Sequence, residues 1–226
     1  MPLHCVGIAG EASGPELLGK GACRRVVQWR MIISATIGKI IWALGVVVWY
    51  AIRYPAMRRA RKLGVARDAG GIGDRTALVI AAAGQFLVPA IYALTGQPSF
   101  ADYPFHVVQL GAGIIILVAA LILFRLTHRQ LGRNWSVTLE TRDHHGLVTD
   151  GLYGYVRHPM YSSFLLFALA ELLLLPNVVA GLAGLVGFAI LFFYRVDREE
   201  ALMAETFGEA YRAYAARTAR LIPGLY

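Results

Sequence analysis

The sequence predicts an all-α integral membrane protein with about five transmembrane helices, the last two forming a helical hairpin that leads into a cytosolic C-terminal helix. Hydrophobic residues make up 57% of the 226 residues and charged residues only 16%, whereas an average soluble domain is about 25% charged. The hydrophobic residues also cluster in long runs, which is typical of membrane-spanning segments. The composition therefore favours one compact membrane domain.

Three apolar runs account for the first three helices. They cover residues 31–52, 77–96 and 105–126. Each run has roughly the 20 residues that cross a hydrocarbon core as an α-helix. We therefore expect three transmembrane helices in this part of the chain.

The fourth run, residues 162–194, is too long for one ordinary span. Pro176 and Asn177 stand near its middle, and such a pair interrupts helices. We therefore expect a tight helical hairpin. Its second arm should continue past Arg195 as one helix through residues 196–216, which are rich in strong helix formers.

The charges of the loops predict the orientation. Residues 53–75, 127–160 and 195–226 are rich in arginine, whereas residues 97–104 contain no lysine or arginine. Basic loops favour the cytoplasmic side of a membrane. We therefore expect a multi-pass protein whose three basic segments, and with them its active site, face the cytoplasm.

The chain divides into three parts. Residues 31–126 hold three transmembrane helices, and residues 127–226 hold the hairpin, the C-terminal helix and the polar residues of chemical interest. Residues 1–30 are basic and lack the continuous apolar core of a signal peptide, so they fit poorly on the outside of the membrane. We expect them to be an N-terminal extension that is either not native or disordered.

The net charge of +8 does not indicate a nucleic-acid partner. The basic residues lie in loops between apolar runs, and no RNA- or DNA-binding motif is present. A metal is not expected either, because His144 and His145 beside Asp143 have no further ligands at metal spacing. The expected partner is the lipid bilayer.

The segment GLYGYVRHPMY, residues 151–161, directly precedes the first arm of the hairpin. Pro159 suits the first turn of a helix, because its missing N–H would be unpaired there anyway. Arg157 and His158 would then stand at the positive end of that helix, which favours an anion such as a carboxylate. Tyr161 opens this arm, so the whole segment is expected at the membrane surface.

The hairpin returns the chain to the same surface at Tyr194, and the following helix carries Glu199 and Glu200. These two side chains point about 100° apart, so one can bind a ligand ammonium while the other pairs with an arginine. The arginines within reach are Arg157, Arg195 and Arg198. Cationic, carboxylate and aromatic groups in one pocket suit a zwitterion with a ring, such as S-adenosylmethionine, whose sulfonium is attracted by aromatic faces.

The last hundred residues resemble the isoprenylcysteine carboxyl methyltransferase family and its relatives, the phospholipid N-methyltransferases. The resemblance rests on HGLVTDGLYGYVRHPMY, an apolar hairpin, the pattern R-x-x-R-E-E-x-x-L-x-x-x-F-G-x-x-Y-x-x-Y and a terminal LIP, in this order. The first hundred residues match only as membrane helices. Ser163 stands where many relatives have glycine, and it is still small.

The resemblance implies a cytoplasm-facing pocket that binds S-adenosylmethionine and releases S-adenosylhomocysteine as the product. Carried over by motif, the cofactor-binding residues are Leu147, Val148, Tyr153, His158, Pro159, Tyr161, Glu199 and Glu200.

The implied reaction is a methyl transfer to a lipophilic or small acceptor, with a prenylcysteine-type carboxylate favoured. A carboxylate needs no general base, but it needs a cation to hold it. Arg195 and Arg157 are the candidates, with Arg195 preferred because it follows the hairpin. An amine or thiol would have to lose a proton, and Glu200 or its neighbour would then accept it.

Simpler interpretations of single residues stay open. The tyrosines of residues 151–161 would also serve as interfacial anchors, His158 as a helix cap, and the two glutamates as solvated charges. Tyr211 and Tyr214 are expected to pack only. Glu171, an ionisable residue within the fourth run, either forms a helix contact or marks the acceptor tunnel.

Two other functions compete with methyl transfer. One is an NADPH-dependent, sterol-reductase-like membrane oxidoreductase, which would need further cations for the phosphates of its cofactor. The other is a non-catalytic membrane scaffold. Binding of S-adenosylhomocysteine rather than NADPH would favour the methyltransferase over the oxidoreductase. Observed methyl transfer would exclude the scaffold.

Overall fold

The computed structural model describes residues 17–60, 67–68, 71–132, 140–141 and 146–224. Within these residues the chain is helical apart from loops and one pair of two-residue strands, β1 Arg67–Asp68 and β2 Glu140–Thr141. The helices are α1 Leu17–Ala60, α2 Ile72–Ala82, a π-helical turn Ala83–Leu87, α3 Val88–Thr95, α4 Val107–Leu131, α5 Pro159–Leu174, α6 Val178–Phe207 and α7 Glu209–Ala215. The residues 1–16 of the predicted extension, and His144 and His145, lie outside the described residues.

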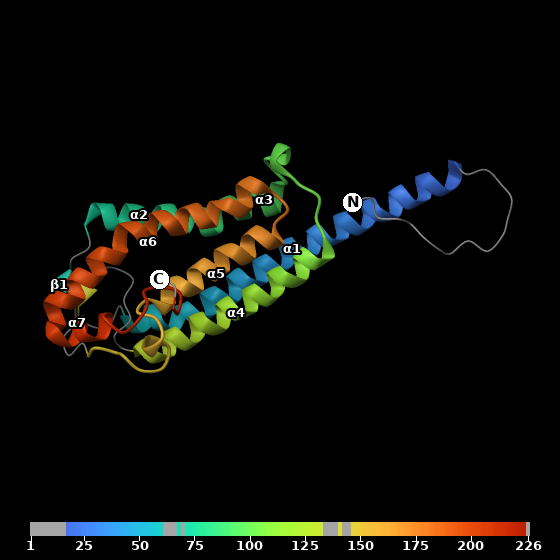
Figure 1. The fold of residues 1–226 in the computed structure, drawn as a ribbon. Coiled ribbons are helices and arrows are strands. Elements are labelled where there is room, and N and C mark those ends of the chain that lie inside the picture. Colours follow the sequence, from blue (N-terminus) through green and yellow to red (C-terminus); the bar gives the residue numbers. More distant parts are fainter. Residues whose placement is uncertain (1–16, 61–66, 69–70, 133–139, 142–145, 225–226) are drawn as a thin grey trace.

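The helices form two groups that the hairpin α5–α6 joins (Figure 1). One group consists of α2 and α3 lying along α6, and the other of α1 and α4 lying along α5. The predicted hairpin is therefore present, and it is the element that connects the two halves of the molecule.

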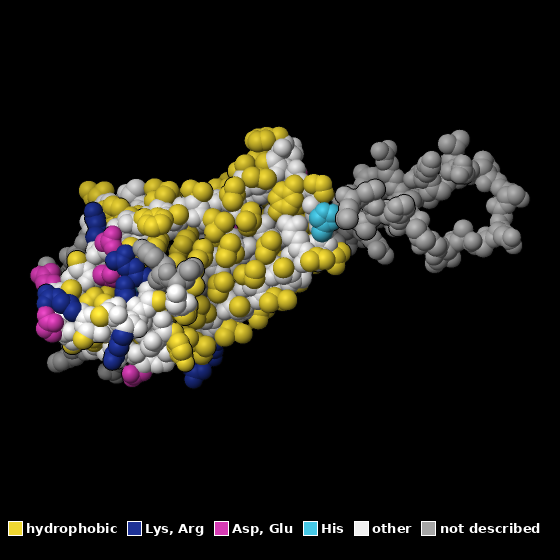
Figure 2. Space-filling model, viewed as in Figure 1, with side chains coloured by type: hydrophobic (Ala, Val, Ile, Leu, Met, Phe, Trp, Pro, Cys, Tyr) yellow, Lys and Arg dark blue, Asp and Glu magenta, His cyan; other side chains and the backbone are white. Residues whose placement is uncertain are grey.

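Four helical segments of the described chain are long and apolar enough to cross a membrane, namely Ala35–Ala60, Ile72–Thr95, Val107–Leu131 and Val178–Phe207. The helix α5 is apolar but only 16 residues long. Hydrophobic side chains cover the helical body, while charged side chains gather at the end that carries α7 (Figure 2). These features indicate a multi-pass membrane protein with four candidate spans and one shorter apolar helix.

The helices α1, α2 and α4 extend beyond the apolar runs that predicted them, and α1 covers Leu17–Ala60 rather than residues 31–52. The helix α2 begins at Ile72 rather than near Ala77, and its first turn includes Asp74, whose negative charge suits a helix N-terminus. The helix α4 continues to Leu131 through polar residues. A prediction from apolar runs alone misses such helix ends, because polar residues also continue a helix when the backbone hydrogen bonds are maintained.

The hairpin turns at the predicted Pro176–Asn177 pair. Asn177 caps α6 by accepting a hydrogen bond from the backbone N–H of Ala180 at 2.9 Å. Its side-chain amide also donates to the carbonyl of Pro98 at 2.7 Å and to Asp102 at 2.8 Å. The turn is therefore fixed to the loop between α3 and α4.

The prediction of one continuous helix through residues 196–216 is wrong at Gly208. The helix α6 ends at Phe207, and Gly208 has a φ of +57°, a conformation that glycine adopts without a steric penalty. The chain then continues as α7, which folds back as a separate short helix.

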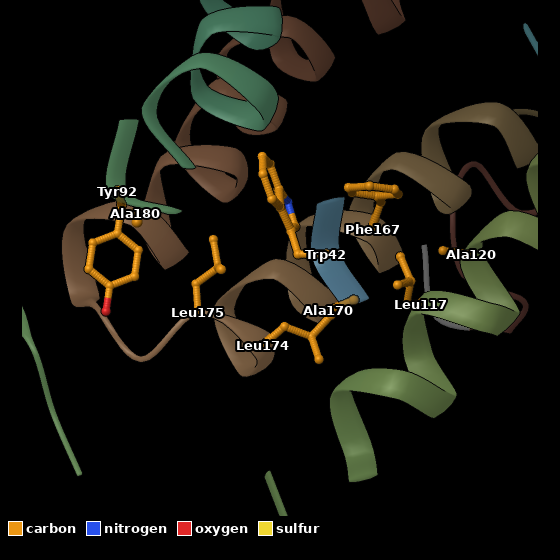
Figure 3. Packing of buried hydrophobic residues seen from close by; sticks show 9 residues of the cluster. All are labelled: Trp42, Tyr92, Leu117, Ala120, Phe167, Ala170, Leu174, Leu175 and Ala180. Atoms are coloured by element: carbon orange, nitrogen blue, oxygen red, sulfur yellow. The ribbon is translucent and has the colours of Figure 1, made fainter. Parts of the chain in front are cut away.

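A hydrophobic core fills the space between the two groups of helices (Figure 3). Its buried residues come from α1, α3, α4, α5, α6 and the hairpin turn. They are Trp42, Tyr92, Leu117, Ala120, Phe167, Ala170, Leu174, Leu175 and Ala180.

Glu171 is fully buried beside this core and accepts three hydrogen bonds. They come from the indole N–H of Trp42 at 3.3 Å, the amide of Gln85 at 3.5 Å and the backbone N–H of Gly184 at 3.2 Å. Glu171 thus joins α1, the π-helical turn and α6, which supports the helix-contact interpretation of this residue. We call Glu171 and these three donors the Glu171 cluster.

Candidate active site

The motif before α5, residues 151–161, is held by the C-terminal tail, residues 216–224. Pro159 occupies the first turn of α5, as predicted, and His158 is the N-cap residue with φ −125° and ψ 60°. The backbone N–H of Arg157 donates to the carbonyl of Ala219 at 2.7 Å, and that of His158 donates to Arg220 at 3.0 Å. The tail therefore lies beside the motif and fixes the direction of its side chains.

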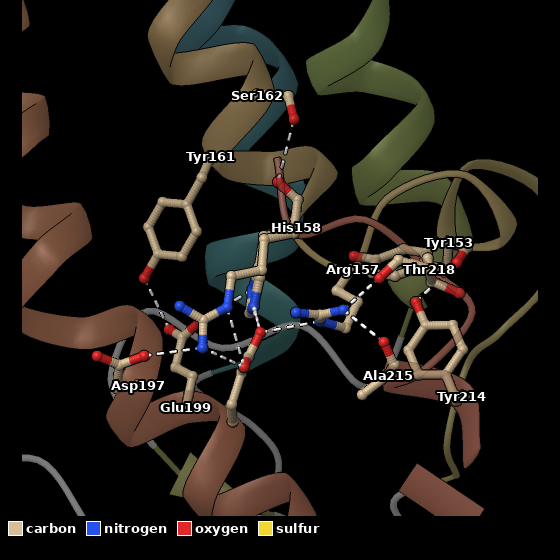
Figure 4. Close-up of polar contacts among 12 residues, drawn as sticks. Tyr153, Arg157, His158, Tyr161, Ser162, Asp197, Glu199, Tyr214, Ala215 and Thr218 are labelled. Atoms are coloured by element: carbon tan, nitrogen blue, oxygen red, sulfur yellow. Dashed lines mark hydrogen bonds and ion pairs between the residues drawn. The ribbon is translucent and has the colours of Figure 1, made fainter. Parts of the chain in front are cut away.

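Glu200 is the acceptor for three basic side chains. Arg157 Nε lies 2.9 Å and His158 Nε2 3.2 Å from Glu200 Oε1, and Arg220 Nη2 lies 2.8 Å from Oε2 (Figure 4). Arg157 also donates to the carbonyls of Ala215 and Thr218. Glu200 therefore links the motif and the tail to α6.

Glu199 faces a different set of groups. Tyr161 donates its hydroxyl to Glu199 Oε1 at 2.9 Å, and Arg195 Nη2 lies 3.1 Å from the same oxygen. His158 Nδ1 lies 3.5 Å from Oε2, so the imidazole stands between the two adjacent glutamates. The angle of about 100° between adjacent helical side chains therefore gives the two glutamates different partners.

Asp74 is a member of this network that the sequence did not indicate. It comes from the first turn of α2 and is almost fully buried, and its Oδ1 lies 3.1 Å from Arg195 Nε. Arg195 therefore bridges Asp74 and Glu199 and ties α2 to α6. Asp74 lay outside both the apolar runs and the motifs, and only the helix packing brings it here.

A cavity of about 590 Å³ opens between the two motif segments, which are residues 151–161 and the part of α6 that carries Arg195 and Glu199. Its polar end is lined by residues 146–148 and by side chains of the motif, α6 and α7. Its apolar end is lined mainly by aromatic and aliphatic side chains of α1, α2, the π-helical turn, α5 and α6. Charge and aromatic surface therefore meet in one space.

The structure brings most of the predicted site residues to this cavity. Pro159 and Glu200 are not part of its lining, since Pro159 is buried at the helix start and Glu200 lies within the ion-pair network. The predicted residues that line it are Leu147, Val148, Tyr153, Arg157, His158, Tyr161, Arg195 and Glu199.

Tyr211 and Tyr214, which were expected to pack only, also line the cavity. Tyr214 donates to the carbonyl of Tyr153 at 2.7 Å, and burial raises the pKa of Tyr214 to about 12. The Tyr211 hydroxyl is buried and has no hydrogen-bond partner among the described residues. Burial and the nearby charge of Glu200 raise the pKa of Tyr211 as well, so at neutral pH it remains a donor.

The region that builds this site matches a known family model. Residues 112–205 match the model of the isoprenylcysteine carboxyl methyltransferase family. We call residues 112–205 the isoprenylcysteine carboxyl methyltransferase region, after the family that they resemble. The resemblance seen in the motifs is thereby confirmed, and the matched region includes α5, most of α6 and both glutamates.

Curated relatives match about half of the chain or somewhat less. Protein-S-isoprenylcysteine O-methyltransferase A of Arabidopsis thaliana is 31% identical over 113 residues, 49% of this chain and 57% of the relative. The Schizosaccharomyces pombe protein-S-isoprenylcysteine O-methyltransferase is 38% identical over 96 residues, 42% of this chain and 41% of the relative. That of Dictyostelium discoideum is 30% identical over 120 residues, 50% and 49% of the two chains.

The chain thus spans about half the length of the curated relatives it matches. The isoprenylcysteine carboxyl methyltransferase region supplies the charged end of the cavity, from Tyr153 to Glu199. Asp74, Arg53 and the residues of α2 that also border the site lie outside it.

Proposed function

We propose that the protein is an S-adenosylmethionine-dependent membrane methyltransferase whose acceptor is a lipophilic carboxylate of the prenylcysteine type. The observation that carries this proposal is one cavity lined by both motif segments, with charged groups at one end and an apolar surface at the other. Its volume of about 590 Å³ lies within the range of about 300–1,000 Å³ common for small-molecule sites.

The groups at the polar end fit the methyl donor. Glu199 keeps 24% of its side chain exposed and lines the cavity, so it can accept from the donor's ammonium. Tyr153 and Tyr161 provide aromatic faces there, which attract a sulfonium. The buried Tyr211 hydroxyl, which lacks a partner among the described residues, is a hydrogen-bond donor that a polar ligand would satisfy.

Glu199 and Glu200 have separate tasks in this proposal. Glu199 faces the ligand, whereas Glu200 holds Arg157, His158 and Arg220 in position. Arg157 and Arg195 act chiefly by orienting these carboxylates, because both guanidinium groups already bind them. Leu147 and Val148 close the cavity beside Tyr153.

When bound, S-adenosylmethionine supplies a methyl group on a sulfonium, so a carboxylate oxygen bonds to the methyl carbon while the carbon–sulfur bond breaks and its electron pair stays on sulfur. No proton has to be removed from a carboxylate acceptor. The protein's task is to align the two reactants and to exclude water. The aromatic and aliphatic lining serves the second purpose.

The apolar end of the cavity favours a lipophilic acceptor. It is lined by Trp49, Phe86, Phe164, Phe167 and Phe188, which suit a hydrocarbon chain. The relatives named above are called protein-S-isoprenylcysteine O-methyltransferases, which makes a prenylated cysteine carboxylate the first acceptor to test. The basic loops support a reaction on the cytoplasmic side of the membrane.

The proposal is tested by methyl transfer in detergent micelles. The purified chain is incubated with methyl-labelled S-adenosylmethionine and N-acetyl-S-farnesylcysteine, and label in the extracted ester is counted. We expect transfer by the wild type and at least about tenfold less by Glu199→Gln, since hydrogen bonds to charged groups contribute about 1.5–3 kcal/mol. The matched control is Glu209→Gln, whose exposed carboxylate pairs only with Arg212 among the described residues.

The result that contradicts the proposal is an absence of label from every lipid, thiol and protein fraction of a membrane extract. That result would favour a non-catalytic scaffold. Saturable NADPH binding without S-adenosylhomocysteine binding would instead indicate the oxidoreductase.

A further inference from the structure

Asp74 is a buried acidic residue that lies outside the isoprenylcysteine carboxyl methyltransferase region. It stands in the first turn of α2, and only 2% of its surface is exposed. Neither of its side-chain oxygens has a hydrogen-bond partner among the described residues. Because a buried charge is costly unless an opposite charge compensates it, an acid at this position needs a cation beside it.

Arg195 provides that cation and shares it with a second carboxylate. Its Nε lies 3.1 Å from Asp74 Oδ1, and its Nη2 lies 3.1 Å from Glu199 Oε1. The helices α2 and α6 are closely packed here, because a Cβ atom added to Gly73 would overlap the hydroxyl of Tyr194. This packing keeps Asp74 opposite Arg195, so one guanidinium serves one carboxylate of α2 and one of α6.

These three side chains carry an excess of negative charge. Asp74 and Glu199 are two carboxylates that face the single guanidinium of Arg195, so the group has a net charge of −1 when all three are ionised. Without the charge of Asp74, Arg195 would neutralise Glu199. Charges interact more strongly in a poorly hydrated space than in water, so the excess favours a cation that enters the cavity beside Glu199.

Glu200 shows the opposite balance. It pairs with two arginines, Arg157 and Arg220, and it does not line the cavity. Glu199 lines the cavity, and 24% of its side chain is exposed. His158 contacts both glutamates and therefore does not distinguish them. The glutamate that faces the cavity is thus the one whose arginine is shared with a second carboxylate.

We propose that Asp74 is a positioning residue for the methyl donor, because it balances the charge of Arg195 and leaves Glu199 with a negative charge for the donor's ammonium. This inference rests on the proposed binding of S-adenosylmethionine, and it names the part of the donor that the charge serves. Asp74 itself does not line the cavity, so it acts through Arg195 and Glu199.

The test compares two ligands that differ in their amino-acid part. S-Adenosylhomocysteine carries the ammonium, whereas methylthioadenosine has the same nucleoside and sulfur but no amino-acid group. Their dissociation constants would be measured by calorimetry on the full chain in micelles.

Two variants separate the charge of Asp74 from its shape. Asp74→Asn keeps the shape and removes the charge, and the double variant Asp74→Asn/Arg195→Gln removes both charges of the pair. Glu209→Gln is the control, since it removes one negative charge from an exposed side chain. Arg53 also lines the cavity, but it is the same in every variant, so its charge does not affect the comparison.

We expect Asp74→Asn to weaken the binding of S-adenosylhomocysteine at least about tenfold, because Arg195 then neutralises Glu199. The binding of methylthioadenosine, which has no ammonium, should stay within about twofold. The double variant should recover most of the affinity for S-adenosylhomocysteine, because the charge of Glu199 is again in excess. It also decides the matter if Asp74→Asn does not fold, since removing both partners of a buried ion pair is tolerated better than removing one. Glu209→Gln should bind both ligands as the wild type does.

Three results would overturn this inference alone. They are an unchanged affinity of Asp74→Asn for S-adenosylhomocysteine, a parallel loss of affinity for both ligands, and a double variant that does not recover the affinity. The second and third would make the ion pair purely structural. A wild type that binds no S-adenosylhomocysteine would overturn the proposed function, and the inference with it, so the two failures are distinguishable in one set of measurements.

Discussion

The hairpin α5–α6 carries carboxylates at two places, one partly buried and one fully buried, and different groups hold them. Near the charged end of the molecule, Glu200 is bound by Arg157, Arg220 and His158. Within the apolar body, Glu171 is bound only by the neutral donors of the Glu171 cluster among the described residues. The cations around Glu200 border the candidate site, whereas the neutral donors around Glu171 fasten α1, the π-helical turn and α6 together.

The comparison also shows why two glutamates of one hairpin are not equivalent. A cluster of opposite charges keeps its members ionised and oriented, which a reaction needs. A carboxyl group surrounded by neutral donors serves chiefly to satisfy those donors, because an unpaired polar group in an apolar environment is costly. Glu171 itself is not part of the cavity lining, although Gln85 is.

The largest effect is expected from Glu200→Ala at the charged end. It removes the carboxylate that Arg157 shares with His158 and Arg220, although Arg220 also pairs with Asp197. This loss should destabilise the fold by roughly 3 kcal/mol or more. Misplacement of the motif should slow methyl transfer at least about 100-fold. Thermal unfolding and label transfer measured on one preparation check both parts, and an active, equally stable variant would show that the network does not organise the site.

Glu171→Leu is expected to affect stability alone. It removes the acceptor of three hydrogen bonds, and unsatisfied buried donors should lower the free energy of unfolding by about 3 kcal/mol. Glu171→Gln keeps an acceptor oxygen and should cost about 1 kcal/mol. Unfolding in micelles measures the difference. A loss of activity with unchanged stability would instead make Glu171 part of the acceptor path.

Gly184→Ala tests the same cluster through its backbone. A Cβ atom there would stand 2.6 Å from Glu171 Oε1 and 3.3 Å from Gln85 Nε2, so the side chains must shift, at a cost of about 2 kcal/mol. Gly111→Ala is the control, since no atom lies within 4 Å of its added Cβ. Equal unfolding temperatures of the two variants would mean that the cluster is not tightly packed.

The smallest effects are expected from the paired variants Tyr211→Phe and Tyr214→Phe. Tyr214→Phe loses the hydrogen bond to the carbonyl of Tyr153, so stability should fall by about 1 kcal/mol. Tyr211→Phe removes a hydroxyl that has no partner among the described residues. Its stability should not fall, whereas its affinity for S-adenosylhomocysteine should drop about fivefold. Calorimetry and thermal unfolding separate the two cases, and the reverse pattern would exclude Tyr211 as a ligand contact.

Those features of the charged end that depend only on local helix and turn chemistry were predictable from the sequence. Pro159 at the first turn of a helix, the break at Pro176–Asn177 and the approach of Tyr161 to the α6 glutamates each needed only helix and turn chemistry. The interruption at Gly208 was visible as a glycine, but its positive φ depends on where α7 packs.

The pairing of Arg157 and Arg195 with the α6 glutamates was predicted, but two further partners in the network were not, because they depend on segments distant in sequence. Asp74 reaches Arg195 only because α2 packs along α6, and Arg220 reaches Glu200 only because the tail folds back beside Arg157. The sequence therefore indicated the glutamates as arginine partners, but it did not indicate Asp74 or Arg220. The separate roles proposed for Glu199 and Glu200 have the same origin.

Calorimetry with S-adenosylhomocysteine and with NADPH on the purified chain tests the central claim most directly. The cavity at the charged end is expected to bind S-adenosylhomocysteine saturably, with weaker binding to Glu199→Gln and none detectable for NADPH. Saturable binding of NADPH together with no heat from S-adenosylhomocysteine would contradict the account.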